Sequence, residues 1–251
     1  MSAFLQATLN GQDGYRSLFE DARNGAAWLP DDFLINNYAD SDTRWLANFE
    51  EDLDPATGSS PGVTLDAENL SIWRETFAEL KSSTLDSHLA VLAWDERVHA
   101  RPAIYRINLG ESAPKTTAQT SLVFSVSNAA ISSLPKSFHL KGGETSGQDD
   151  ERQVLDWSIV LTDISGEQAR LPLSHDQLLY PQIESDTRRF GVLNSTPSSE
   201  LVMRRYRFPL RDFVMVNPGL DLGHLRSICF EFDRTPRGAI ALDDIGLTTP
   251  L

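Results

Sequence analysis

The chain ends in the stretch Arg237-Gly238-Ala239-Ile240-Ala241-Leu242-Asp243-Asp244-Ile245-Gly246-Leu247-Thr248-Thr249-Pro250-Leu251. Apolar residues alternate with small or polar ones from Ile240 to Leu247, and this period of two predicts a half-buried β-strand. Two adjacent carboxylates, Asp243 and Asp244, interrupt the alternation. Two explanations stay open: the pair binds a cation, or one Asp faces solvent while the other accepts hydrogen bonds from a neighbouring loop.

Strand-like runs recur upstream of this stretch, separated by turn formers at spacings typical of a β-sandwich. The runs are 45–49, 63–65, 70–75, 88–94, 103–109, 121–126, 155–163, 169–173, 201–209 and 225–232. About ten strands without a βαβ alternation predict one antiparallel β-sandwich over residues 44–251.

Residues 1–43 follow a different pattern. Helical spacing places Tyr15, Leu18, Phe19 and Ala22 on one face of a short helix over 14–23, which ends near Gly25. The segment is too apolar to be a free linker. We expect residues 1–43 to be an N-terminal extension that packs on the main domain or on a preceding one.

The composition excludes several classes of partner. The formal net charge is −14, from 36 acidic and 22 basic residues, whereas phosphate backbones and anionic membranes require concentrated Lys and Arg. We interpret the basic cluster Arg204-Arg205-Tyr206-Arg207 as a strand with an exposed face. The single cysteine, Cys229, permits no disulfide framework and is expected in the core. No signal-peptide pattern opens the chain, and no apolar run reaches the length of a membrane span.

Catalytic motifs are missing from the sequence. The stretch Gly110-Glu111-Ser112-Ala113-Pro114 carries Pro where a nucleophile elbow needs its second Gly. The histidines stand singly, without the short spacing of zinc ligands. We therefore assign no catalytic residue and expect a protein that is not an enzyme.

The C-terminal third resembles a known architecture. Its motifs are Arg207-Phe208-Pro209-Leu210-Arg211-Asp212-Phe213, Ile228-Cys229-Phe230-Glu231-Phe232 and Ile240-Ala241-Leu242-Asp243-Asp244-Ile245. They resemble the end of galactose-binding-like jelly rolls, the architecture of many carbohydrate-binding modules. There, a Pro-Leu-x-x-Phe turn precedes an Ile-x-Phe-x-Phe strand, and an Ile-x-Leu-Asp-Asp-Ile strand closes the domain. The resemblance implies a jelly-roll sandwich.

A second resemblance concerns the N-terminal part. Segments 33–41, 49–54 and 69–75 are similar to the accessory region that follows the catalytic domain in some secreted bacterial α/β-hydrolases. This implies an exported bacterial protein, located in the periplasm or outside the cell. The sequence itself carries no hydrolase motif.

The jelly-roll resemblance also implies a structural calcium ion, held between an acidic turn after the first strand and the closing Asp pair. The matching positions are Glu50, Glu51 or Asp52 in the turn, and Asp243 or Asp244 in the closing strand. Calcium takes six to eight oxygen ligands, and two acidic segments with loop carbonyls supply such atoms.

Sugar recognition by jelly rolls commonly stacks an aromatic ring on a pyranose face. Trp94, which precedes Asp95-Glu96-Arg97, and Tyr180, in an irregular loop, are the candidate ligand-binding residues. The function expected is a non-catalytic accessory module, carbohydrate-binding-like, with polysaccharide as its partner. The alternative is a structural domain that supports a neighbouring α/β-hydrolase domain, esterase- or lipase-like, without binding sugar.

Overall fold

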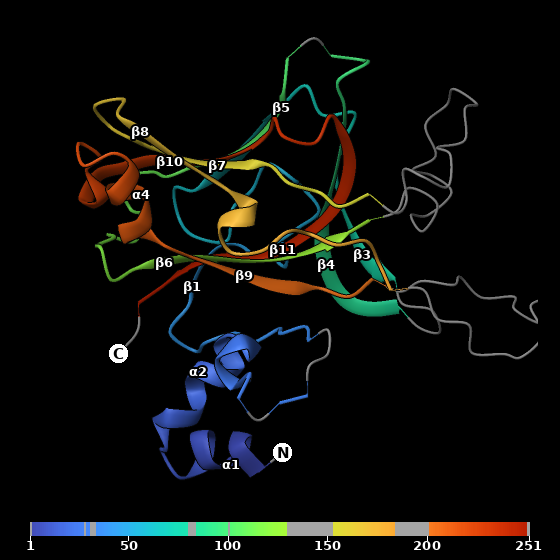
Figure 1. The fold of residues 1–251 in the computed structure, drawn as a ribbon. Helices are drawn as coiled ribbons and strands as arrows, with labels where there is room; N and C mark the ends of the chain where they lie inside the picture. Colours follow the sequence, from blue (N-terminus) through green and yellow to red (C-terminus); the bar gives the residue numbers. More distant parts are fainter. Residues whose placement is uncertain are drawn as a thin grey trace, which may run out of the picture.

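The protein is described by a computed structural model that covers residues 2–27, 29–30, 34–79, 84–99, 101–129, 153–183 and 201–249. Two antiparallel sheets lie face to face in this part of the chain (Figure 1). Sheet A has the order β3 (Ile72–Glu79), β4 (Thr84–Asp95), β11 (Arg237–Thr248), β6 (Ser121–Asn128) and β9 (Arg204–Pro209), with β1 (Arg44–Ala47) paired to β11. Sheet B has the order β2 (Thr64–Glu68), β5 (Ala103–Asn108), β10 (Leu225–Phe232), β7 (Ser158–Asp163) and β8 (Gln168–Pro172).

The predicted antiparallel sandwich is confirmed. After the hairpin of β3 and β4 in sheet A, the chain runs to β5 in sheet B, β6 in sheet A, the β7–β8 hairpin in sheet B, β9, β10 and finally β11. This repeated crossing between the two sheets is the jelly-roll winding that the sequence resemblance implied.

The closing strand β11 is central to sheet A. One edge pairs first with β4, up to Leu242 opposite Ala90, and then with β1, from Ile245 opposite Ala47. The other edge pairs with β6, and the register shifts between Asp243 and Gly246. Asp244 has a positive φ of 54° at this bulge. The two acids therefore lie where β11 exchanges one partner strand for another.

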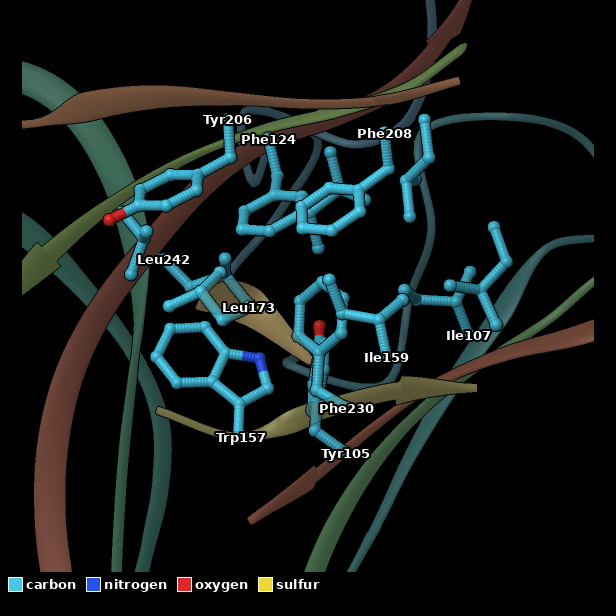
Figure 2. Close-up of a cluster of buried hydrophobic side chains, with 14 of the residues drawn as sticks. Tyr105, Ile107, Phe124, Trp157, Ile159, Leu173, Tyr206, Phe208, Phe230 and Leu242 are labelled. Carbon is cyan, nitrogen blue, oxygen red and sulfur yellow. The ribbon is translucent and has the colours of Figure 1, made fainter. Parts of the chain in front are cut away.

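Aromatic side chains from both sheets fill the core, as Figure 2 shows. Tyr206 and Phe208 stack on Phe124 from sheet A, at ring-centroid distances of 5.4 and 5.9 Å. Phe230 on β10 meets Phe124 from the opposite sheet at 4.9 Å. Alternate residues of a strand face opposite sides, so each inward ring is followed by an outward residue. On β9 the outward residues are Arg205 and Arg207.

Short helices lie outside the sheets. They are α1 (Ser2–Leu9), η1 (Asp13–Tyr15), α2 (Arg16–Glu20), η2 (Ala22–Gly25), η5 (Leu173–His175), α4 (Leu210–Val216) and η7 (Leu222–His224). The helix predicted over 14–23 is broken at Asp21, whose backbone is extended and whose carboxylate caps the amide of Arg23. Helix α1 was not predicted. Among the described residues, none of the helices has the length and apolar character needed to cross a membrane.

Candidate functional site

A cavity of about 690 Å³ lies between the N-terminal extension and the outward face of sheet A. Figure 1 shows the extension, with α1 and α2, on the side of the sandwich that carries β6 and β9. We call this space the extension cavity. Its polar lining includes Arg23, Asn24, Asp176, Gln177, Arg207 and Arg211.

Charged contacts hold the extension against the sandwich. Arg23 donates through Nη1 to the backbone oxygen of Asp176 at 2.8 Å and through Nη2 to its carboxylate. Glu20 pairs with Arg207 at 3.1 Å, and the amide of Arg205 donates to the carbonyl of Asn36 at 2.9 Å. The described part of the extension is therefore anchored to the sandwich through Glu20 and Arg23 and through Asn36. The division of the chain at residue 43 into two domains stays a prediction.

The basic cluster on β9 is less exposed than its sequence indicated. Arg204 and Arg205 are both buried, and the guanidinium of Arg205 lies 5.2 Å from the ring centroid of Trp45. Burial lowers the pKa of Arg205 to about 10, although Asp244 and Asp243 oppose the shift. The prediction of an exposed strand face is wrong, because the extension and Trp45 cover it.

Trp94 lies in the core. Its exposed fraction is 2%, its ring stacks on Phe232 at a centroid distance of 4.1 Å, and its Nε1 donates to the carbonyl of Thr235 at 2.7 Å. Gly238 faces the same ring, with no room for a Cβ atom between them. The ring has no free face for a sugar, so Trp94 is a packing residue rather than a binding residue.

Tyr180 lies at the surface, with an exposed fraction of 44%. The guanidinium of Arg204 is 5.6 Å from its ring centroid, and both residues line a shallow hollow together with Ser127, Asn128 and Gln182. Asn128 is held by Gln182, which donates to its carbonyl at 2.7 Å. An accessible ring beside hydrogen-bonding side chains is compatible with sugar stacking, so Tyr180 stays a candidate.

The two acidic segments meet beside β11. The carboxylate of Glu50 accepts from the Ser87 hydroxyl at 2.9 Å and from the His88 amide at 3.1 Å, at the beginning of β4. Burial, followed by the charges of Asp244 and Glu50, raises the pKa of Asp243 to about 8. Burial and Glu50 also raise the pKa of Asp244. The charge of Glu50 thus disfavours the ionised form of both Asp243 and Asp244, and we call these three residues the closing-strand carboxylates.

Glu51 and Asp52 are exposed, and their charges act on a different group. Together with burial, which is the largest cause, and with the charge of Glu50, they raise the pKa of Glu75 to about 7. Glu75 lies 3.4 Å from Nδ1 of His88, which in turn is 3.0 Å from the Phe49 carbonyl. Of the predicted turn residues, Glu50 is the one whose charge raises the pKa of both Asp243 and Asp244.

The closing-strand carboxylates fit calcium in chemistry but are not preassembled for it. All their donors are hard oxygens, which suit this ion. Arg205 already supplies a cation there, donating to the Asp244 carbonyl at 3.2 Å and lying 3.7 Å from its carboxylate. Among the described residues, no group of three or more His, Cys, Asp or Glu side chains is arranged to hold a metal ion. Calcium therefore stays a proposal.

Comparisons with known proteins bear on the fold. No protein-family model matches the sequence, and no curated protein does. Among solved structures, an exo-β-agarase matches with a TM-score of 0.48 and 11% identity, over 84% of this chain and 25% of that one. A family 30 carbohydrate-binding module matches with a TM-score of 0.45 and 15% identity, over 81% and 91% of the two chains. A family 11 carbohydrate-binding module from Clostridium thermocellum, in complex with a β-1,3-1,4-mixed-linked tetrasaccharide, matches at 0.41 and 10%, over 85% and 99%.

With TM-scores of 0.41 to 0.48, these matches are reported as similarities alone. The chain spans about a quarter of the length of the agarase that it matches. Likeness at this level assigns neither a ligand nor an activity to the chain. The second resemblance, to the accessory region of secreted hydrolases, stays a prediction.

Proposed function

We propose that the protein is a non-catalytic module that binds carbohydrate in the extension cavity. The supporting observation is the chemistry of the cavity wall. Arg23 and Asn24 face it from the extension, and Asp176 and Gln177 face it from the sandwich. Sugar hydroxyls both donate and accept hydrogen bonds, so a wall that mixes guanidinium, amide and carboxylate groups suits them. A volume of about 690 Å³ lies in the range of small-ligand pockets.

Hydrogen bonds already hold two polar side chains of the wall, which favours binding. Asp176 is fixed by Arg23 and by the amide of Arg207, which donates to its Oδ2 at 3.1 Å. Asn36 is fixed by its amide nitrogen, which donates to the carbonyls of Leu18 and Phe19. Polar groups that are already held in place lose little side-chain entropy when a ligand arrives. The proposed parent is an exported bacterial protein, and the proposed compartment is the periplasm or the cell exterior.

Binding in the cavity predicts that Gln177→Ala weakens the complex with a recognised polysaccharide about fivefold, the loss of one neutral hydrogen bond. Affinity electrophoresis in gels that contain mixed-linkage glucan, agarose, xylan or polygalacturonate measures the effect. The control is Gln168→Ala, at an exposed position on β8 in sheet B, which should bind as the wild type does. Failure of the wild type to be retarded by any polysaccharide would show the proposal to be wrong.

Tyr180 provides a second, separable prediction. If its ring stacks on a sugar, Tyr180→Ala should weaken polysaccharide binding about threefold to tenfold, the range expected for an aromatic contact. Phe77→Ala is a matched control, because Phe77 has the same exposed fraction of 44% but lies on the edge strand β3. Equal retardation of Tyr180→Ala and wild type would confine the site to the extension cavity.

A second candidate function has its own observation. Phe4, Leu5 and Leu9 on helix α1 are exposed, and such apolar residues on one short helix favour a protein partner. In this alternative, the extension packs against a neighbouring hydrolase domain and the sandwich supports it without binding sugar. Polysaccharide binding by the isolated chain distinguishes the two functions.

We also propose that calcium binds at the closing-strand carboxylates. Glu50, Asp243 and Asp244 would hold the ion together with nearby carbonyl oxygens. The ion would neutralise carboxylates that now repel one another, and it would tie β11 to the turn that follows β1. Its role would be to stabilise the fold.

A further inference from the structure

The lining of the extension cavity holds more arginines than acids, although the protein is acidic. Four guanidinium groups line the cavity, those of Arg23, Arg205, Arg207 and Arg211, against the carboxylates of Glu20, Asp21 and Asp176. Four positive charges and three negative ones leave an excess of one positive charge. The whole chain carries a formal net charge of −14. An anionic ligand would therefore find more arginines in this cavity than the net charge of the protein indicates.

Three of the four arginines have close partners. Arg23 is paired with Asp21 at 2.8 Å and also with Asp176. Arg207 is paired with Glu20 at 3.1 Å and donates from Nε to the Ser121 hydroxyl. Arg205 donates to the Ser125 hydroxyl and to the Asp244 carbonyl, both at 3.2 Å. These three guanidinium groups mainly hold the wall together.

Arg211 differs from them. It lies on α4 with 70% of its side chain exposed, and its recorded partner is Oδ1 of Asp212 at 3.7 Å. That carboxylate is engaged more closely by His175, whose Nε2 lies 2.9 Å from Oδ2. The Asp212 carboxylate thus contacts both His175 and Arg211, and its contact with Arg211 is the longer of the two. The Arg211 guanidinium retains donors for a ligand, and its planar fork matches a carboxylate or sulfate group.

We infer that the extension cavity takes an acidic saccharide, a sugar chain with carboxylate or sulfate groups, and that Arg211 pairs with the anionic group while the amides bind hydroxyls. The inference rests on the proposed function and names its ligand class. The long-range repulsion from the other charges of the protein is screened within about 8 Å at physiological salt, so the nearest charges decide the preference.

The test compares polysaccharides that share a backbone and differ in charge. Polygalacturonate is compared with its fully methyl-esterified form, and a sulfated galactan is compared with its desulfated form. We expect the full chain to bind at least one acidic form about tenfold more tightly than its neutral counterpart, the value of one charge-assisted contact. The responding pair shows whether the group is a carboxylate or a sulfate.

Arg211→Gln should remove this preference and weaken binding of the acidic form about tenfold. Arg226→Gln is the matched control, because Arg226 is an exposed arginine on β10 of sheet B, and this variant should keep the preference. Equal binding of charged and neutral forms by the wild type would overturn the inference and leave the proposed function intact. Absence of binding to every form would overturn both.

Discussion

Replacing Phe230 with alanine is expected to lower the free energy of unfolding by about 3–5 kcal/mol, the usual range for removing a fully buried phenyl ring. Phe230 has no exposed surface, and it contacts the Phe124 ring of the opposite sheet at a centroid distance of 4.9 Å. Tyr105 and Trp157 pack on it from within its own sheet, at 6.3 Å each. The substitution would leave a cavity between the two sheets that these rigid rings cannot close.

Urea unfolding followed by tryptophan fluorescence measures the change. Met215→Ala is the control, because Met215 has an exposed fraction of 79% on α4 and should change stability by less than about 0.5 kcal/mol. A loss below about 1 kcal/mol for Phe230→Ala would contradict the central position of this ring. Its effect on polysaccharide binding should follow stability alone, since Phe230 does not line the extension cavity.

Much of the fold could be predicted from alternation along the chain. In β10, Ile228, Phe230 and Phe232 are all inward and fully buried, and this strict period of two is visible in the sequence. The sequence also indicated the bulge in β11. The inward residues Leu242 and Ile245 are three positions apart instead of two, which indicates one extra residue between them.

The candidate site was harder to predict, because it forms between segments distant in sequence. Arg23 meets Asp176 across 153 positions, and nothing in either local pattern indicates the contact. Trp94 was misplaced for a related reason. The charged residues after it indicated an exposed strand end, whereas Asp95 is buried and pairs with Arg97 at 2.7 Å. A charge that is paired locally does not mark a solvent-facing site.

The two acidic segments could be predicted in part, less completely than the strands and better than the extension cavity. The sequence resemblance predicted that the turn and the closing strand meet, and the charge of Glu50 acts on the pKa of both Asp243 and Asp244. The resemblance did not separate Glu50 from Glu51 and Asp52, because three consecutive acids have the same local pattern. The hydrogen bonds that Glu50 accepts from Ser87 and His88 on β4 distinguish it from Glu51 and Asp52. The local sequence of either segment does not indicate such a contact between distant segments.

Asp243→Asn should stabilise the calcium-free protein at alkaline pH by an amount on the order of 2 kcal/mol or more. Burial, Asp244 and Glu50 raise the pKa of Asp243 to about 8 in the folded state. In the unfolded chain an Asp titrates near its ordinary pKa of about 4. Between these values the folded state holds a proton that the unfolded state has released, so stability falls as pH rises through this window. Above pH 8 the full loss is present, and below pH 4 it is absent.

The variant should therefore match the wild type near pH 4 and exceed it at pH 8.5, measured by urea unfolding in EDTA. Asp42→Asn, at an exposed position before β1, is the control, and its stability relative to the wild type should not change with pH in this way. A constant difference between Asp243→Asn and wild type across this pH range would mean that Asp243 does not titrate as its surroundings indicate.

Calcium should stabilise the wild type more than Asp243→Asn. If the ion binds the closing-strand carboxylates, calcium at 100 times its dissociation constant adds about 2.7 kcal/mol to the wild type at pH 8.5. Asp243→Asn and Glu50→Gln should gain little, because each has lost a charged ligand. The stability advantage that Asp243→Asn has in EDTA should therefore shrink in calcium by about the gain of the wild type. A wild-type melting temperature that neither EDTA nor calcium changes would show that no such ion binds, and that Arg205 is the cation that balances Asp244.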